Sequence, residues 1–339
     1  MVDQIHLFKR QFREINFHPW ELQFKRPAKT SKTTLNVHRV LYISAQLPNG
    51  EFRWGEIAPL THLSSEKVEE CANWIHRWWK ERVSFQDLPS SIKFGLECLL
   101  QPLFLQQKNF KAIPFNGLVW MNELDAMYSE AKEKLIAGCP CIKLKVGALD
   151  FKSEWRLIHQ LREEFGNTFI LRLDANGAWS ANEALHKLNE LAPLKVHSIE
   201  QPIATRQWRD MAQLMRLSPI PLALDEELIG IYGEERRNML EEIIPHYLVL
   251  KPTLHGGFAS CDEWIQLANE RQIQWWATSA LESNLGLSHI FQWLQKYDLK
   301  MHQGLGTGAL YQNNWRSPLV VSNFQMQWDE QSQWEAPWI

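Results

Sequence analysis

The pattern of hydrophobic and polar residues divides the chain into two parts. Near the N-terminus, residues 35–47 alternate between apolar and polar side chains, and Asn49-Gly50 separates them from a second strand pattern at 52–56. An Asn-Gly pair between two such runs is typical of a tight hairpin turn. Helical patterns follow over about 64–80 and about 91–105. Strands followed by helices predict an α+β domain here.

From residue 115 onward, short apolar runs recur, and a helical pattern follows each of them. Equivalent strand ends are 29 residues apart from Lys145 to Asp174, and the next three spacings are 26, 25 and 26 residues. One strand, one helix and two loops need this length, so the repeat predicts a parallel sheet closed into a (β/α)8 barrel. The predicted strands are 117–121, 141–146, 169–174, 196–200, 222–225, 247–251, 273–279 and about 301–305.

These patterns predict an α/β protein with two domains, as the length of 339 residues also suggests. We place the N-terminal α+β domain at residues 1–110 and the barrel at residues 111–310. The tail, residues 311–339, contains no further strand–helix unit. We expect it to pack back on the first domain.

Charged residues end five successive strands of the predicted barrel. The carboxyl ends of parallel strands face one mouth of a barrel, so these side chains should converge there. Three adjacent carboxylates would repel one another without a cation, and oxygen ligands without His or Cys favour Mg²⁺ over zinc. Each of these residues alone has an ordinary structural explanation. Five charged residues in order, at near-constant spacing, favour a catalytic role. In order, they are Lys145, Asp174, Glu200, Asp225 and Lys251.

This set of residues suits the removal of a proton next to a carboxylate. Mg²⁺ bound to the carboxylate makes the α-proton easier to remove, because the charge of the enediolate falls on the metal. A nearby cation and partial burial lower the pKa of a lysine, so that it can act as a base. Lys145 and Lys251 come from strands on either side of the three carboxylates and would face each other across the metal.

Composition argues against several other classes of protein. The 36 basic and 39 acidic residues leave a net charge of −3, which is not typical of a nucleic-acid-binding surface. We find no signal-peptide pattern and no apolar run of the roughly 18 residues that span a bilayer. Five cysteines without regular spacing fit a reducing compartment, so we expect a cytoplasmic protein.

The 17 tryptophans suggest one alternative of a different class, a non-catalytic module that binds sugars by stacking. Trp74 and Trp78 stand four residues apart, on one face of a predicted helix. That spacing favours packing in a core over an exposed stacking surface.

The motifs at the strand ends resemble the enolase superfamily and, within it, the o-succinylbenzoate synthase family. The superfamily carries Lys-x-Lys on one barrel strand, then Asp, Glu and Asp as metal ligands, then a lysine. In the first domain the resemblance is thinner and rests on residues 27–32 and 53–60. In the barrel it is carried by LDANGAW (173–179), IEQPI (199–203), ALDEELIG (223–230), LKPTLHGGF (250–258), TSALESNLGL (278–287) and QGLGTG (303–308).

This resemblance implies an enolase-like barrel covered by an N-terminal capping domain. It implies a Mg²⁺-dependent syn dehydration of 2-succinyl-6-hydroxy-2,4-cyclohexadiene-1-carboxylate to 2-succinylbenzoate, through an enediolate, in menaquinone biosynthesis. Lys145 would remove the proton α to the ring carboxylate and return it to the departing hydroxyl. Lys251 would stabilise the enediolate from the opposite face, and Lys143 would tune Lys145. The implied metal ligands are Asp174, Glu200 and Asp225.

Five further residues are candidate contacts of this small carboxylate substrate. Ser279, Ser283, Gly304 and Gly306 stand near the ends of the last two strands, where small residues leave room for the succinyl group. Helix capping and tight turns are the alternative roles for these residues. Lys32 lies in a capping-domain loop that would close over the substrate and offers a positive charge to the succinyl carboxylate. We expect no nucleic-acid or membrane partner, and the oligomeric state stays open.

Another reaction of the same superfamily is an open alternative. Racemisation of N-acylamino acids and epimerisation of dipeptides need a base on each face, and Lys145 and Lys251 could supply both. Dipeptide epimerases of the superfamily carry a carboxylate pair at the end of the last strand, where this chain has Gly304-Leu305-Gly306. This disfavours them but leaves an N-acylamino acid racemase, or another racemase or cycloisomerase, as the alternative.

Overall fold

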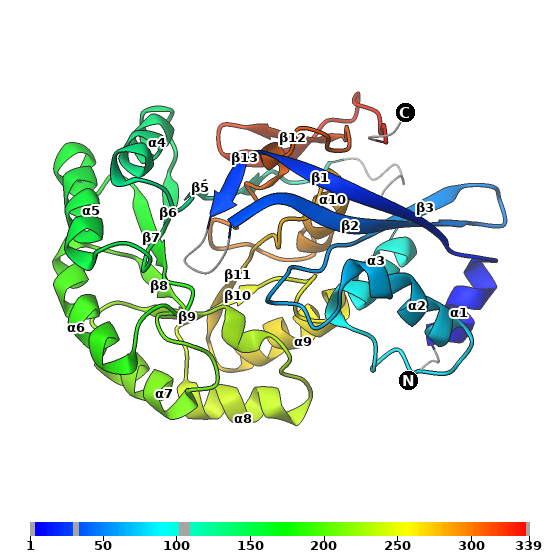
Figure 1. Ribbon diagram of the computed structural model, residues 1–339, viewed down its shortest axis with the longest axis horizontal. Helices are drawn as coiled ribbons and strands as arrows, with labels where there is room; N and C mark the ends of the chain where they lie inside the picture. The colour runs from blue at the N-terminus through cyan, green and yellow to red at the C-terminus, as the bar shows by residue number, and fades with distance from the viewer. Residues whose placement is uncertain (1–3, 30–33, 102–108, 337–339) are drawn as a thin grey trace.

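The computed structural model describes residues 4–29, 34–101 and 109–336 (Figure 1). The N-terminal part is a three-stranded antiparallel sheet with three helices. Its elements are α1 (Gln4–Gln11), β1 (Asn16–Lys29), β2 (Thr34–Gln46), β3 (Phe52–Ile57), α2 (Val68–Trp79) and α3 (Ser90–Leu100).

The second part is a curved parallel sheet with helices around its outside (Figure 1). The sheet consists of β5 (Gly117–Val119), β6 (Cys141–Lys145), β7 (Ile170–Asp174), β8 (Ser198–Glu200), β9 (Leu222–Leu224), β10 (Tyr247–Leu250) and β11 (Gln274–Ala277). The short strand β4 (Ile113–Pro114) precedes β5 and belongs to a separate small sheet. The helices of the second part are α4 (Leu124–Ile136), α5 (Phe151–Phe165), α6 (Ala181–Leu191), α7 (Trp208–Leu217), α8 (Glu234–Ile243), α9 (Gly257–Glu270) and α10 (Asn284–Leu294). Short 3₁₀ turns are η1 (Ala192–Leu194), η2 (Glu226–Leu228) and η3 (Gly308–Leu310).

The predicted hairpin is confirmed as β2 and β3, but the sequence analysis did not predict β1. The strand does carry an alternating run, Trp20-Glu21-Leu22-Gln23-Phe24, which the sequence analysis did not use, but it also carries prolines at 19 and 27, which argue against a strand. Its pairing with β2 also shifts register between Gln23 and Ala28. The sheet has two covered faces. Ile43 and Ile57 pack with α2 and α3, whereas Val40 and Tyr42 pack with residues of the barrel loops and the tail.

The tryptophan pair on α2 contributes to a core, as predicted. Trp78 is buried between α1 and the sheet, and Trp74 packs against the same cluster. The ring of Trp78 meets that of Phe8 edge to face, with centroids 5.1 Å apart. This arrangement uses the aromatic area of Trp78 for packing in the core.

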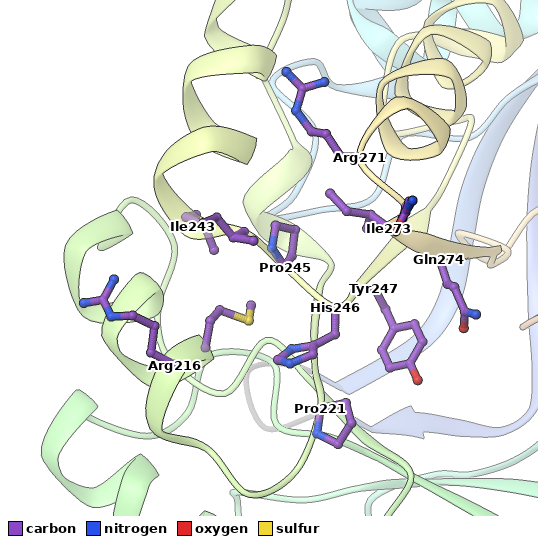
Figure 2. A pocket seen from close by; sticks show the side chains of 12 residues that line it. Arg216, Pro221, Ile243, Pro245, His246, Tyr247, Arg271, Ile273 and Gln274 are labelled. Carbon is purple, nitrogen blue, oxygen red and sulfur yellow. The ribbon is translucent and has the colours of Figure 1, made fainter.

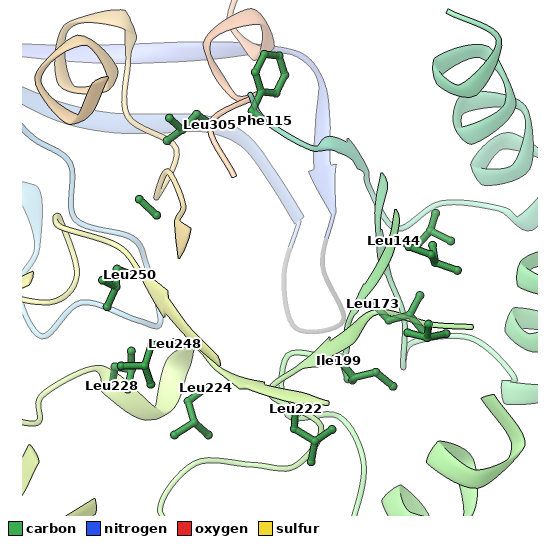
Figure 3. Packing of buried hydrophobic residues seen from close by; sticks show 14 of the residues in the cluster. Phe115, Leu144, Leu173, Ile199, Leu222, Leu224, Leu228, Leu248, Leu250 and Leu305 are labelled. Carbon is green, nitrogen blue, oxygen red and sulfur yellow. The ribbon is translucent and has the colours of Figure 1, made fainter. Parts of the chain in front are cut away.

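The strands of the parallel sheet alternate outward and inward side chains. Leu144, Leu173 and Ile199 point toward the surrounding helices and belong to the main hydrophobic core (Figure 3). The residues next to them along each strand therefore point to the interior of the barrel. This alternation places the charged residue that ends each strand at the barrel mouth.

Seven of the eight predicted barrel strands form, in the order β11-β10-β9-β8-β7-β6-β5. The eighth, predicted at about 301–305, is reduced to isolated parallel bridges from Gln303 to Phe115 and from Gly304 to Thr278. The backbone N–H of Asn116 donates to the Gln303 carbonyl at 2.9 Å, and that of Gly304 to the Ala277 carbonyl at 2.7 Å. This short segment closes the gap between β11 and β5.

The tail contacts both parts of the protein. Strands β12 (Leu319–Ser322) and β13 (Gln325–Trp328) form a small antiparallel sheet with β4, next to the barrel. Tyr311 and Trp315 instead pack with the N-terminal sheet. The division at residue 110 stays a prediction. No helix in the described residues is both long and apolar enough to cross a membrane.

Candidate active site

Three carboxylates meet at the mouth of the barrel. Asp174 ends β7, Glu200 ends β8, and Asp225 directly follows β9. All three are fully buried, and one oxygen from each lies within 4.8 Å of the others. The parallel register pairs Lys145 with Asp174 and Asp174 with Glu200, which explains why residues far apart in the sequence lie side by side.

Two lysines of β6 approach these carboxylates from one side. The Lys145 ammonium donates to Asp174 Oδ2 at 2.6 Å and to Asn176 Oδ1 at 2.8 Å. The Lys143 ammonium donates to the same Asp174 oxygen at 3.1 Å and to Glu200 Oε2 at 2.7 Å. Both lysines are buried, so few water molecules compete for these contacts.

Lys251 approaches from the other side. It follows β10 directly, and its Nζ atom lies 2.6 Å from the Asp225 carboxylate. Lys251 and Lys145 therefore flank the carboxylates from strands β10 and β6, as the sequence predicts. The structure brings together all six predicted catalytic and metal-binding residues.

Burial and charge act in opposite directions on the pKa values of this cluster. Burial alone would raise the pKa of Asp174, but the positive charges of Lys145 and Lys143 hold it well below its usual value. Burial raises the pKa of Glu200 to about 7, because Lys143 offsets it only in part and the other two carboxylates add to it. Without a further cation, the cluster is short of positive charge around Glu200.

The pKa values of Lys143 and Lys251 are raised. Burial would lower the pKa of Lys143, but Glu200 and Asp174 raise it above its usual value. Asp225 does the same for the pKa of Lys251. Each of these lysines is held as a cation by a carboxylate neighbour.

The donor set fits a divalent cation. It consists of carboxylate oxygens, which hard cations such as Mg²⁺ and Ca²⁺ prefer. Glu200 Oε1 is buried and accepts no hydrogen bond from any residue that the structure describes. An unpaired buried carboxylate oxygen is costly, and a bound cation would satisfy it.

A cavity of about 110 Å³ lies above the cluster. Leu60 and Leu63 of the N-terminal domain cover one side of it, so this domain does cap the barrel mouth. Leu118, which lies in β5, and Trp120, which directly follows it, add further apolar surface. The polar lining residues are Asn116, Lys143, Lys145, Asn176, Glu226, Lys251, Thr278, Ser279 and Thr307.

A larger hollow lies at the opposite end of the barrel, where β9, β10 and β11 begin (Figure 2). It has about 540 Å³ and is lined by side chains such as Arg216, His246 and Arg271. His246 accepts a hydrogen bond from the backbone of Leu222, and Arg271 pairs with Glu241. Since the carboxylates and lysines end at the other mouth, this hollow is not the catalytic site.

Of the five predicted substrate contacts, three line the cavity: Ser279, Gly304 and Gly306. Ser283 does not line it: this residue is the N-cap of α10, and its hydroxyl donates to Glu56 at 2.5 Å. Lys32 lies outside the described residues.

Five polar lining residues were missed by the sequence analysis: Asn116, Asn176, Glu226, Thr278 and Thr307. Asn176 accepts from Lys145 and donates to Glu226 Oε1 at 2.8 Å, so it links the lysine to a further carboxylate. Both stand within two residues of a predicted metal ligand, which was the available signal. Asn116 Oδ1 and Thr278 Oγ1 are buried without a hydrogen-bond partner among the described residues. Thr278 directly precedes the predicted contact Ser279, which was the available signal, whereas no local pattern marks Asn116.

Comparison with known proteins identifies the family of the chain. A family model for an enolase C-terminal domain-like fold matches residues 126–329, and a model for the MenC N-terminal domain matches residues 13–103. The o-succinylbenzoate synthase of Desulfotalea psychrophila is 38% identical over 91% of this chain and 97% of its own length.

Solved structures show the same architecture. The crystal structure of MenC from Desulfotalea psychrophila has a TM-score of 0.79 and 35% identity, covering 92% of this chain and 99% of that one. Muconate lactonizing enzyme from Pseudomonas fluorescens has a TM-score of 0.84 at 20% identity, covering 96% and 97% of the two chains, and shows the shared fold alone. The chain therefore belongs to the o-succinylbenzoate synthase family of the enolase superfamily.

Proposed function

We propose that the chain carries out the o-succinylbenzoate synthase reaction in the cavity above the three carboxylates. The reaction is the dehydration of 2-succinyl-6-hydroxy-2,4-cyclohexadiene-1-carboxylate to 2-succinylbenzoate and water, a hydro-lyase step. One observation carries this proposal: three buried carboxylates lie between lysines that approach from opposite sides. Such a site can hold a substrate carboxylate and place an amine on each face of the carbon next to it.

We infer that the bound cation is Mg²⁺, held by Asp174, Glu200 and Asp225. The donor oxygens and the unpaired Glu200 Oε1 support a hard divalent ion. When bound, Mg²⁺ would withdraw charge from the substrate carboxylate and so acidify the α-proton. The protein residues then have to hold the ring, move one proton and exclude water.

Lys145 is the proposed base. In its uncharged form, its Nζ atom would take the proton from the ring carbon that bears the carboxylate. Asp174 and Asn176 hold this amine at 2.6 and 2.8 Å, which fixes its direction toward the cavity. Lys145 then returns the proton to the ring hydroxyl as the C–O bond breaks, and water leaves. A single base on one face gives the syn stereochemistry.

Lys251 acts from the opposite face as a cation. Asp225 keeps it charged and positions it next to the carboxylates. Its charge would stabilise the negative charge that develops on the substrate when the proton leaves. Lys143 stands two residues before Lys145 and contacts the same Asp174 oxygen, so we assign it the role of tuning the base electrostatically.

The succinyl arm would lie against the wall formed by the β11 end and the closing segment. Ser279, Gly304 and Gly306 line that wall. A Cβ atom at Gly304 would lie 2.4 Å from Thr278 Oγ1, so this position has no room for a side chain. Lys32 keeps its proposed role as a positive charge for the succinyl carboxylate.

A substrate assay tests the proposal directly. The purified chain should convert the cyclohexadiene substrate with Mg²⁺ present, as followed by ultraviolet absorbance when the ring becomes aromatic. The same preparation should be tested for racemisation of an N-succinylamino acid, because lysines on both faces favour that second activity. Racemisation without dehydration would overturn the assignment of the main reaction.

A further inference from the structure

A buried glutamate of the capping domain reaches the helix that follows strand β11. Glu56 lies on β3 and is fully buried. Its carboxylate accepts hydrogen bonds from the backbone N–H groups of Ser283 and Gly286, both at 2.8 Å, and from the Ser283 hydroxyl. These donors belong to the first turn of α10, where N–H groups lack helical partners and a negative charge is favourable.

Gly286 makes this contact between the domains possible. A Cβ atom at this position would lie 2.8 Å from Glu56 Oε2 and 2.8 Å from the Cβ of Glu282. A side chain here would displace the Glu56 carboxylate from the first turn of α10. The glycine thus serves the close approach of Glu56, and Glu56 holds Ser283 in place.

Glu282, next to Ser283 in the sequence, holds two loops of the barrel mouth together. Its carboxylate is fully buried and accepts from the Ser279 hydroxyl at 2.5 Å and from the Ala280 backbone at 2.8 Å. It also accepts from the hydroxyl of Thr253, which stands two residues after Lys251. The loop after β11 and the loop after β10 are therefore joined through one side chain.

Ser279 has used its hydrogen-bonding capacity in this network. Its hydroxyl donates to Glu282, and it accepts from the Thr307 hydroxyl at 2.7 Å and from the Leu281 backbone at 3.1 Å. One donor and two acceptor sites are all that a serine hydroxyl offers. Ser279 thus shapes the cavity wall through its position, and that position depends on its neighbours.

We propose that Glu56 is a positioning residue for the synthase reaction. Through Ser283 it fixes the segment that contains Glu282, and so it sets the place of Ser279 and of the loop after Lys251. Docking of the capping domain and the shape of the barrel mouth are coupled by this side chain. The inference deepens the function proposed above and rests on it.

Glu97 provides a matched control in the same protein. It lies on α3 of the capping domain, is half-buried, and accepts from the backbone N–H groups of Phe258 and Ala259 at the start of α9. It therefore makes the same kind of contact as Glu56, between the capping domain and the N-terminus of a barrel helix. None of the cavity-lining residues that the structure describes accepts or donates a hydrogen bond to it.

The experiment compares Glu56→Gln with Glu97→Gln in the full chain. Both variants lose a carboxylate that accepts backbone N–H groups, so both should have a lower free energy of unfolding in urea. At a temperature where both are folded, Glu56→Gln should lower kcat/KM by about tenfold or more, with the affinity for Mg²⁺ unchanged, because small displacements of substrate-positioning groups are costly. Glu97→Gln should stay within about twofold of the wild type, since it is not a neighbour of the cavity.

Amide hydrogen exchange provides a readout that does not depend on turnover. Glu56→Gln should speed exchange at Ala280 and Leu281 relative to the wild type, whereas Glu97→Gln should not. The milder Ser283→Ala variant keeps the carboxylate and should show the same effects to a smaller degree, so a poorly folded Glu56→Gln still leaves a test. The proposal would be overturned if the Glu56 and Glu97 variants had equal kinetics and equal exchange rates. If the wild-type chain itself did not convert the substrate, that result would instead count against the proposed function.

Discussion

The Nζ atom of Lys145 lies 2.6 Å from Oδ2 of Asp174, so the proposed base and a proposed metal ligand form one ion pair. The same oxygen also accepts from Lys143. A metal ion held by Asp174 would therefore share this carboxylate with both lysines.

Replacement of the two lysines separates their roles. Lys145→Ala should lower kcat by about 10²–10⁴-fold, which is the usual contribution of a positioned acid–base group. Lys251→Ala should lower kcat by roughly 10²–10³-fold, because it removes a charge that stabilises the transition state and leaves the base in place. In an analogue that lacks the ring hydroxyl, Lys145→Ala should abolish exchange of the α-proton with deuterium oxide, and Lys251→Ala should only slow it.

Circular dichroism should show that both variants fold. Asp174 keeps Lys143 as a partner when Lys145 is replaced, so no carboxylate of that ion pair is left alone. A Lys145→Ala enzyme with wild-type turnover would rule out its role as the base.

Removal of the metal should abolish turnover while the fold remains. The hydrophobic core lies between the barrel strands and the outer helices, apart from the carboxylates. Excess chelator should therefore leave the far-ultraviolet circular dichroism unchanged. Added Mg²⁺ should restore activity and, at a hundred times its dissociation constant, raise the free energy of unfolding by about 2.7 kcal/mol.

Glu200→Gln tests the metal role further. It should raise the concentration of Mg²⁺ needed for half-maximal activity, because one charged ligand becomes neutral. Full turnover in excess chelator would contradict the role of the metal.

The convergence of the proposed catalytic residues could be predicted because they follow a local rule. Each of Lys145, Asp174, Glu200, Asp225 and Lys251 stands at or directly after the end of a strand, and parallel strands bring their ends together whatever the details of packing. The rule needs a regular strand. The segment at about 301–305 carries glycine at 304, pairs through single bridges and does not form the predicted strand.

Contacts between the domains follow no such rule. Glu56 and Ser283 are 227 residues apart, and their sequence neighbourhoods show neither the partner nor the distance. Ser283 could be read as a helix cap or as a substrate contact, and its pairing with Glu56 places it at the cap. Local patterns thus predict which residues reach the barrel mouth. The contacts that hold these residues in place depend on tertiary packing, which local patterns do not show.

Gly304 should not tolerate a side chain. A Cβ atom here would lie 2.4 Å from Thr278 Oγ1 and 2.9 Å from its Cγ2, closer than atoms can pack. Gly304→Ala should therefore lower the free energy of unfolding by roughly 1–3 kcal/mol and raise KM by narrowing the cavity. The double variant Gly304→Ala with Thr278→Ala removes both clashing atoms and should recover most of the lost stability. Urea denaturation and steady-state kinetics check this, and additive losses in the double variant would show that the two positions do not contact each other.

Glu97 should make stability depend on pH. Burial raises its pKa from 4.5 to about 7, and the hydrogen bonds from Phe258 and Ala259 lower it only in part. Between these two values the folded chain holds a proton that the unfolded chain has released, so the contribution of this group to stability is fully present below about pH 4.5 and is lost as the pH rises through about 7.

The Glu97→Gln variant provides the reference, because the glutamine side chain does not titrate. The free energy of unfolding of the wild type minus that of Glu97→Gln should therefore fall by on the order of 3 kcal/mol between pH 4.5 and pH 8. Urea denaturation of both proteins across this range measures the difference, in which the titration of all other groups cancels. A difference that stays constant with pH would mean that the pKa of Glu97 is the same in the folded and unfolded chains. A difference that rises with pH would mean that the helix stabilises the anion of Glu97.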